Sequence, residues 1–262
     1  MSPVTVQSGD SPVILGLPHG GTFVPAEIFK RLNDPGQGLD DTDWHISQLY
    51  DGLLPDVTTV TATFHRYVID ANRDPEGVSL YPGQNTTGLC PLTDFDGRPI
   101  WRGGQEPSAD EIGQRCIQFH KPYHDALAVE IERVRAVHGY AILYDCHSIR
   151  SEIPFLFDGL LPIFNIGTNN ATTCAAEIEQ AVLAICSNAA GFDHVLNGRF
   201  KGGWTTRHYG VPEQGVHALQ MEIAQRAYMN EQAPWTYRDD LAAQIRPHLS
   251  KILRALAACQ TQ

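Results

Sequence analysis

Short apolar runs recur along the chain, and most of them lead into polar residues or glycine. A run of four to eight apolar or β-branched residues bounded by such signals predicts a buried strand. The strands predicted in this way are Val13–Leu17 and residues 57–64, 140–144 and 216–223. Glu222 lies within the last of these runs, as a polar residue among apolar neighbours.

Between the strands, apolar positions recur with helical spacing. This pattern covers residues 110–137, 172–187 and 239–258, and Pro122 predicts a bend in the first of these helices. A shorter helical pattern begins at Trp44, directly after the capping residues Asp41, Thr42 and Asp43. Strands that alternate with helices predict an α/β fold, with a mixed, mainly parallel sheet and helices on both faces.

Polar residues gather where the predicted strands end. His19 follows the first strand within Pro18-His19-Gly20-Gly21, residues 66–73 follow the second, and Asp145 and His147 follow the third. Ligands of such sheets bind at the carboxyl ends of the strands. We therefore expect these residues to share one pocket. The long segment 76–107, rich in Gly, Pro, Asn and Thr, predicts a loop over it.

Composition narrows the class of molecule. The 262 residues, 42% of them hydrophobic, suit one large α/β domain that spans 1–262, or at most two small ones. The net charge of −11, without any block of Lys and Arg, argues against a nucleic-acid partner. No run reaches the roughly 20 apolar residues of a membrane span, and the first ten residues do not resemble a secretory signal. Six scattered cysteines without a CxxC pair favour reduced thiols. We expect a cytoplasmic protein that does not bind membranes.

His19 and His147 are candidate metal ligands. A catalytic zinc takes three protein ligands and keeps one position for water, so two histidines need a third partner. Asp43 is the candidate carboxylate, with Asp40 and Asp41 as alternatives. His120 and His124 have the i, i+4 spacing of a chelating pair but lack the HExxH glutamate, and packing around Pro122 is the favoured interpretation.

Candidate substrate-binding and catalytic residues stand near these ligands in the predicted fold. Arg66 and the Asn72-Arg73 pair can bind a carboxylate or an oxyanion. Burial of Glu222 in a strand would raise its pKa toward the value of a general base. The segment 202–210 predicts a polar loop with glycines at both ends, in which Thr205 and Arg207 are expected to contact substrate.

Eight motifs in order resemble those of the N-formylglutamate amidohydrolases, or deformylases. They run from about Pro18 to about Tyr228, most of the chain. The motifs are PHGGT (18–22), DTDWH (41–45), RYVIDANR (66–73), YPGQNTTG (81–88), HKPYH (120–124), DCHS (145–148), GGWTTRHYG (202–210) and LQME (219–222). Any one of them is weak evidence, whereas eight in the same order are strong evidence.

The resemblance implies a three-layer α/β/α fold of the phosphorylase/hydrolase type, similar to zinc carboxypeptidases and aspartoacylases. It also implies one divalent metal ion, expected to be Zn²⁺, held by two histidines and a carboxylate. Those relatives use a His-x-x-Glu pair, but Thr22 stands three residues after His19, so Asp43 is the proposed substitute. By the same resemblance Arg66 polarises the scissile carbonyl, Asn72 and Arg73 bind the substrate carboxylate, and Glu222 is the base.

The activity implied is hydrolysis of N-formyl-L-glutamate, a small anionic N-acyl amino acid, to formate and L-glutamate as the last step of histidine degradation. A deacylase or small carboxypeptidase acting on another N-acyl amino acid is an alternative, because one methyl group changes binding by only about 1–3 kcal/mol. A non-catalytic anion-binding protein is another. An arginase-like manganese enzyme would need a DxHxD motif, whereas Ser148 and Ile149 follow His147.

Overall fold

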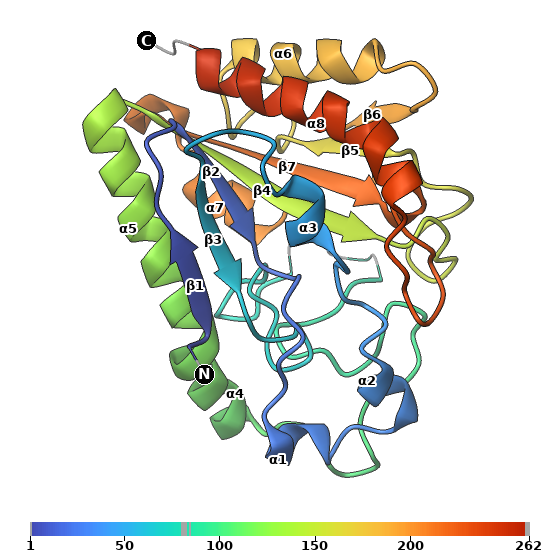
Figure 1. Cartoon of the computed structure of the whole chain (residues 1–262). Helices are drawn as coiled ribbons and strands as arrows, with labels where there is room; N and C mark the ends of the chain where they lie inside the picture. Colours follow the sequence, from blue (N-terminus) through green and yellow to red (C-terminus); the bar gives the residue numbers. More distant parts are fainter. Residues whose placement is uncertain (1, 80–82, 84, 260–262) are drawn as a thin grey trace.

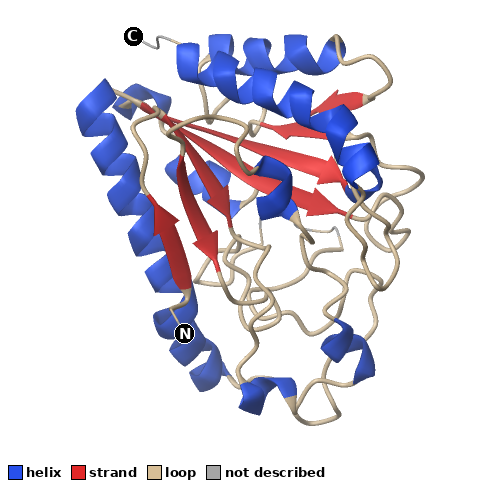
Figure 2. Ribbon diagram, in the orientation of Figure 1, coloured by secondary structure: helices blue, strands red, loops and turns tan. Residues whose placement is uncertain are grey.

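A seven-stranded mixed sheet forms the centre of the computed structural model, which describes residues 2–79, 83 and 85–259 (Figures 1 and 2). The strands lie in the order β1-β3-β2-β4-β7-β5-β6. Their bounds are Val4–Gln7 (β1), Val13–Leu17 (β2), Thr58–Ala62 (β3), Ala141–Ile149 (β4), Phe164–Gly167 (β5), His194–Leu196 (β6) and Val216–Ala224 (β7).

The middle of the sheet is parallel. β2 pairs in parallel with β3 and β4, and β4 pairs in parallel with β7, so these four strands end at one edge. β1 and β5 are each antiparallel to one neighbour, β3 and β7 respectively. Every residue of β2, β4 and β7 is buried, as expected for strands covered on both faces. This edge is where ligands bind in such sheets.

Helices cover both faces of the sheet, which gives three layers (Figure 1). Helix α5 (Lys121–His138) covers one face, where Leu127 and Ile131 pack on residues of β2 and β4. The other face is covered by α3 (Ile46–Tyr50), α6 (Ala176–Ser187) and α8 (Asp239–Ala258). The predicted fold class, α/β with a mixed and mainly parallel sheet, is confirmed.

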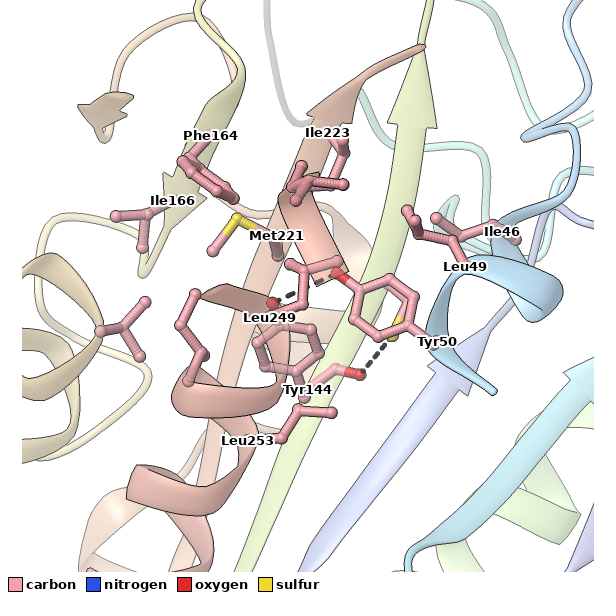
Figure 3. Packing of buried hydrophobic residues seen from close by; sticks show 14 of the residues in the cluster. Ile46, Leu49, Tyr50, Tyr144, Phe164, Ile166, Met221, Ile223, Leu249 and Leu253 are labelled. Carbon is pink, nitrogen blue, oxygen red and sulfur yellow. Dashed lines mark hydrogen bonds between the residues drawn. The ribbon is translucent and has the colours of Figure 1, made fainter. Parts of the chain in front are cut away.

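The amphipathic helix α8 lies on β7 and β5 through its apolar side. Leu249 and Leu253 are fully buried in the same cluster as Met221 of β7 and Ile166 of β5 (Figure 3). Across the layer, the Tyr50 and Tyr144 hydroxyls are 3.2 Å apart, which links α3 to β4. This packing fixes β4 and β7, the two strands that carry most of the site described below.

Several predicted elements differ from the structure. The third strand does not end at residue 144, because β4 keeps its pairing with β7 as far as Ile149. The segment 202–210 is not a loop: Trp204–Tyr209 forms the short helix α7, and the glycines flank it. The short strands β1, β5 and β6 were not predicted. β2, β3, β7 and α8 lie where they were expected, while α6 begins only at Ala176.

The predicted helix 110–137 is interrupted before Pro122. It consists of α4 (Ala109–Arg115), a π-helical turn, η1 (Cys116–His120), and then α5. Proline lacks an N–H, so regular α-helical hydrogen bonding cannot continue through it. Short helical segments complete the described elements: α1 (Ala26–Phe29), α2 (Asp34–Gly38), η2 (Pro212–Gln214) and η3 (Gln225–Ala227).

The predicted loop 76–107 contains no helix and no named strand among its described residues. Residues 80–82 and 84, which belong to the YPGQNTTG motif or directly precede it, lie outside the described residues. Among the helices in the described part of the chain, none is long and apolar enough to cross a membrane.

Candidate active site

Two histidines meet at the carboxyl edge of the sheet. His19 lies just past β2, and His147 lies within the neighbouring parallel strand β4. Their Nδ1 atoms are 3.2 Å apart, and both side chains are buried. Pairing of β2 with β4 thus brings together two residues that are 128 positions apart in the sequence.

Asp43 joins the two histidines. Its Oδ2 lies 3.4 Å from His147 Nδ1 and 3.9 Å from His19 Nδ1. The three residues form a buried group whose potential ligand atoms all lie within 4.8 Å of one another, and we call this group the trio. The Asp43 N–H donates to the His19 carbonyl at 3.1 Å, which turns the chain after β2 back toward the histidine.

The two alternative carboxylates lie elsewhere. Asp41 accepts hydrogen bonds from the Tyr67 hydroxyl at 2.7 Å and from the Phe95 N–H at 2.9 Å. Burial raises the pKa of Asp41 to about 7, partly offset by the Tyr67 hydrogen bond. Asp40 lies 3.4 Å from the Arg98 guanidinium. Of the three aspartates, the geometry therefore favours Asp43 as a metal ligand.

A second carboxylate lies close to the Nε2 atom of each histidine of the trio. His19 Nε2 lies 2.7 Å from Asp70 Oδ1, so Nε2 carries the ring proton. The lone pair of His19 Nδ1 therefore faces the other two residues of the trio. His147 Nε2 lies 3.1 Å from Asp145 Oδ2. Two imidazole nitrogens and a carboxylate oxygen are ligands that a divalent cation such as zinc prefers. The trio therefore fits such an ion.

The charges around the trio shift its pKa values in opposite directions. Burial, helped by the nearby Arg66 cation, lowers the pKa of His19. Burial would also lower the pKa of His147, but Asp145 and Asp43 outweigh it and raise that pKa well above its usual value. Asp43 is buried too, yet Arg66 and the histidines hold its pKa below the usual value.

Glu222 stands beside His147 because of strand register. β4 and β7 pair so that His147 is opposite Glu222 and Asp145 is opposite Gln220. The Gln220 amide donates to Glu222 Oε2 at 3.1 Å. Burial raises the pKa of Glu222 to about 7, with Asp43 adding to the rise and His147 opposing it. A cation at the trio would lower this pKa and keep the carboxylate ionised.

Arg66 and Asn72 contact the trio directly. Arg66 Nη2 donates to Asp43 Oδ1 at 2.5 Å. Asn72 Nδ2 lies 3.1 Å from His147 Nε2, and its Oδ1 accepts from the Thr205 N–H at 2.9 Å. A Cβ on Gly203 would lie only 2.3 Å from Asn72 Nδ2, so this close approach requires glycine. Arg66 and Asn72 also line the cavity described next.

A cavity opens over the trio with an empty volume, mouth included, of about 600 Å³. His19, His147 and Glu222 line it, together with the three arginines Arg66, Arg73 and Arg199. Its remaining lining residues are Asn72, Asn85, Thr86, Thr87, Phe95, Ser148, Ile149, Leu156, Phe200, Gly203 and Gln220. The excess of arginines makes it suited to a small anion, although the chain as a whole carries −11.

Two residues expected to contact substrate are not among the lining residues. Thr205 is fully buried, and its N–H holds Asn72 instead. Arg207 Nε donates to the Gly202 carbonyl at 2.9 Å. Arg199 lines the cavity but was missed, because it stands alone after a short strand with no motif around it. Gln220, which holds both Glu222 and the Gly203 N–H, was missed although it belongs to the LQME motif.

Comparison with known proteins gives the family. A model of the N-formylglutamate amidohydrolase family matches residues 11–229, a span that contains all eight motifs. The chain is 46% identical over 256 residues to the N-formylglutamate deformylase of Pseudomonas aeruginosa and 44% identical to that of Pseudomonas putida. Each match covers 97% of this chain and 96% of the relative.

The chain belongs to the N-formylglutamate amidohydrolase family.

Solved structures agree with this assignment. The crystal structure of N-formylglutamate amidohydrolase from Ralstonia eutropha superposes with a TM-score of 0.80 at 25% identity, over 98% of this chain and 97% of that one. A gene product from Agrobacterium tumefaciens gives a TM-score of 0.69 at 20% identity, over 98% and 96% of the two chains. At that identity, the second likeness shows the fold alone.

In this amidohydrolase family member, His120 and His124 hold the backbone on which Asn72 and Arg73 stand. His120 Nε2 lies 3.0 Å from the Arg73 carbonyl, and His124 Nε2 lies 2.7 Å from the Ala71 carbonyl. Because a carbonyl only accepts, both Nε2 atoms are donors. Burial lowers the pKa of His124 to about 3, which keeps this ring neutral. The pair therefore supports the cavity wall, in line with the packing role that the sequence favoured over metal chelation.

Proposed function

We propose that this amidohydrolase hydrolyses N-formyl-L-glutamate to formate and L-glutamate with one divalent cation, expected to be zinc, at the trio. The observation that carries the proposal is the adjacency of His19, Asp43 and His147 to Glu222 in one arginine-lined cavity. The curated relatives from both Pseudomonas species are named for this substrate. We further propose that residues 1–262 form a single catalytic domain and that the reaction closes histidine degradation.

The cation would supply Lewis acidity for the formyl carbonyl and lower the pKa of an attacking water. Glu222 lines the cavity beside His147, where it can take the proton of that water and pass it to the departing amine nitrogen. The formyl C–N bond then breaks, and formate and the free amino group of glutamate form. One carboxylate thus serves as the base toward the water and as the acid toward the departing amine.

Arg66 and Arg73 would hold the negative charges of the substrate. The Arg66 guanidinium lines the cavity next to Asp43 and can stabilise the oxyanion that develops on the formyl oxygen. Arg73 and Asn72 would bind the α-carboxylate, the group closest to the scissile amide. Arg73 is oriented for this by hydrogen bonds from Nε to the Thr87 carbonyl at 2.9 Å and from Nη2 to the Thr87 hydroxyl at 3.0 Å.

The direct test is release of formate from N-formyl-L-glutamate by protein loaded with zinc, compared with an EDTA-treated sample. We expect rapid release that EDTA abolishes and added zinc restores. No release from the metal-loaded protein would overturn the proposed substrate. Rates on N-acetyl-L-glutamate and N-acetyl-L-aspartate, measured in parallel, would then identify a deacylase of another N-acyl amino acid.

Replacing His124 by Leu is expected to lower kcat/KM by about 10-fold, because it leaves the Ala71 carbonyl without its donor, a loss of about 1–3 kcal/mol. The effect should appear mainly in KM, since the turn carries Asn72 and Arg73 rather than the base. His124→Gln keeps a donor and should recover most of the activity. Wild-type kinetics in His124→Leu would contradict the supporting role.

A further inference from the structure

The cavity offers more positive charge than one carboxylate requires. Of its three arginines, Arg66 donates to Asp43 at 2.5 Å and is assigned to the oxyanion, while Arg73 Nη1 lies 3.6 Å from Asp70 Oδ2. Arg73 and Arg199 come from opposite sides of the central strand β4, after β3 and after the edge strand β6 respectively. N-formyl-L-glutamate carries two carboxylates, so on the proposed function two negatively charged groups need cationic contacts in this cavity.

Arg73 and Arg199 are held along one short piece of chain. Arg73 Nε donates to the Thr87 carbonyl, and Arg199 Nη2 donates to the Asn85 carbonyl, both at 2.9 Å. Two residues span at most about 7 Å, so the two carbonyls lie within that distance of each other. The carboxylate carbons of glutamate are four C–C bonds apart, about 5 Å when extended. An upper bound of about 7 Å on the separation of the two anchoring carbonyls is compatible with a dicarboxylate of this length.

The surroundings of each arginine decide which carboxylate it takes. Arg73 follows Asn72, whose amide contacts His147 of the trio, so Arg73 lies on the side of the reacting centre. Arg199 is instead anchored on Leu156, whose carbonyl accepts from Arg199 Nε at 3.0 Å. Leu156 and Phe200 line the cavity next to it and can contact the substrate methylenes.

We propose that Arg199 binds the side-chain carboxylate of the substrate and thereby sets the preference for glutamate over neutral amino acids. This inference rests on the proposed function. The guanidinium has two of its N–H groups fixed on backbone carbonyls, which orients it before a ligand arrives. An oriented guanidinium distinguishes a carboxylate from an amide of the same shape by charge-assisted hydrogen bonding.

The test compares kcat/KM for N-formyl-L-glutamate with kcat/KM for N-formyl-L-glutamine, whose side chain has the same shape and no charge. The wild type should prefer glutamate by about 10- to 100-fold. Arg199→Gln should bring this ratio close to one. Arg73→Gln should lower both rates and leave the ratio unchanged, because both substrates share the α-carboxylate.

Arg135→Gln is the matched control, since Arg135 also donates to a backbone carbonyl, that of Gln214, but lies outside the cavity lining. It should keep the wild-type ratio. Arg199→Lys keeps the charge without the two-pronged geometry and should keep only part of the ratio. If Arg199→Gln does not fold, the ratio of the two kcat/KM values is measured in Arg199→Lys instead.

The outcomes separate the two proposals. A wild type that releases no formate from either substrate overturns the proposed function itself. A wild type that prefers glutamate, together with an unchanged ratio in Arg199→Gln or in a folded Arg199→Lys, overturns the role of Arg199 alone. A wild type that deformylates both substrates equally well also overturns that role, while it leaves the deformylase activity in place.

Discussion

Replacing Glu222 by Gln is expected to lower kcat on N-formyl-L-glutamate by about 100- to 10,000-fold while the protein keeps its bound metal. The amide has the shape of the carboxylate but cannot accept the proton of the attacking water. Glu222 lies opposite His147 in the β4–β7 register. It lines the cavity but does not belong to the trio. Metal content should therefore stay close to that of the wild type, as measured by elemental analysis of the dialysed protein.

Glu130→Gln is a suitable control for this variant. Glu130 is also a buried carboxylate, but it lies on α5, outside the cavity lining, and pairs with Arg133 at 2.7 Å. It should retain wild-type turnover. A Glu222→Gln protein that turns over at the wild-type rate would exclude Glu222 as the base. Loss of metal in the same variant would instead make it part of the metal site.

Replacing Asp43 by Asn is expected to remove most of the bound metal and to lower kcat/KM by more than about 100-fold. Substitution of a residue that supports a metal ligand already lowers metal affinity or activity by about 10- to 100-fold, and substitution of a ligand should lower them further. The neutral amide is a weaker ligand, and it also leaves the buried Arg66 without its 2.5 Å carboxylate partner. Metal content and formate release, measured on the same preparation, check this expectation.

Asp41→Asn and Asp40→Asn are the matched controls, because both aspartates stand within three residues of Asp43 and neither belongs to the trio. The amide oxygen introduced by Asp41→Asn could still accept the hydrogen bonds that Tyr67 and Phe95 donate to Asp41. Both variants should keep their metal. Retention of metal in Asp43→Asn with its loss in Asp41→Asn would transfer the ligand role to Asp41.

Supply of excess zinc separates two reasons for inactivity in these variants. An Asp43→Asn protein with weakened metal affinity should recover part of its activity as the zinc concentration rises. Glu222→Gln should not recover, since its metal site is intact and the proton acceptor is missing. Recovery of Glu222→Gln by zinc would contradict the division of roles between the two carboxylates.

The sequence alone determined the central strands, the main helices and a core of site residues: the trio, Arg66, Asn72, Arg73 and Glu222. Apolar runs such as Val13–Leu17 are buried on both sides of the sheet, so their composition is sufficient to identify them. His19, Arg66 and His147 each stand at or near the end of such a run, where parallel strands bring ligand-binding residues together. Strand periodicity and the ordered motifs thus led to one pocket before any contact was known.

Weakly apolar or very short elements could not be predicted in this way. β1 is mostly exposed, and β6 has only three residues, so neither carries a clear pattern. They are strands because a neighbouring strand offers its backbone hydrogen bonds. The segment around Thr205 looked like a loop because of its glycines, yet these glycines flank α7, and one of them lets the backbone approach Asn72.

Only the tertiary structure decided which side chains meet. Asp40, Asp41 and Asp43 are equivalent carboxylates in the sequence, and the turn that joins Asp43 to His19 separates them. Glu222 lies beside His147 because β4 pairs with β7 in one particular register. Arg199 lines the cavity, whereas Arg207, which the sequence favoured, does not. Composition and periodicity act within a segment, whereas these contacts depend on the pairing and packing of segments distant in the chain.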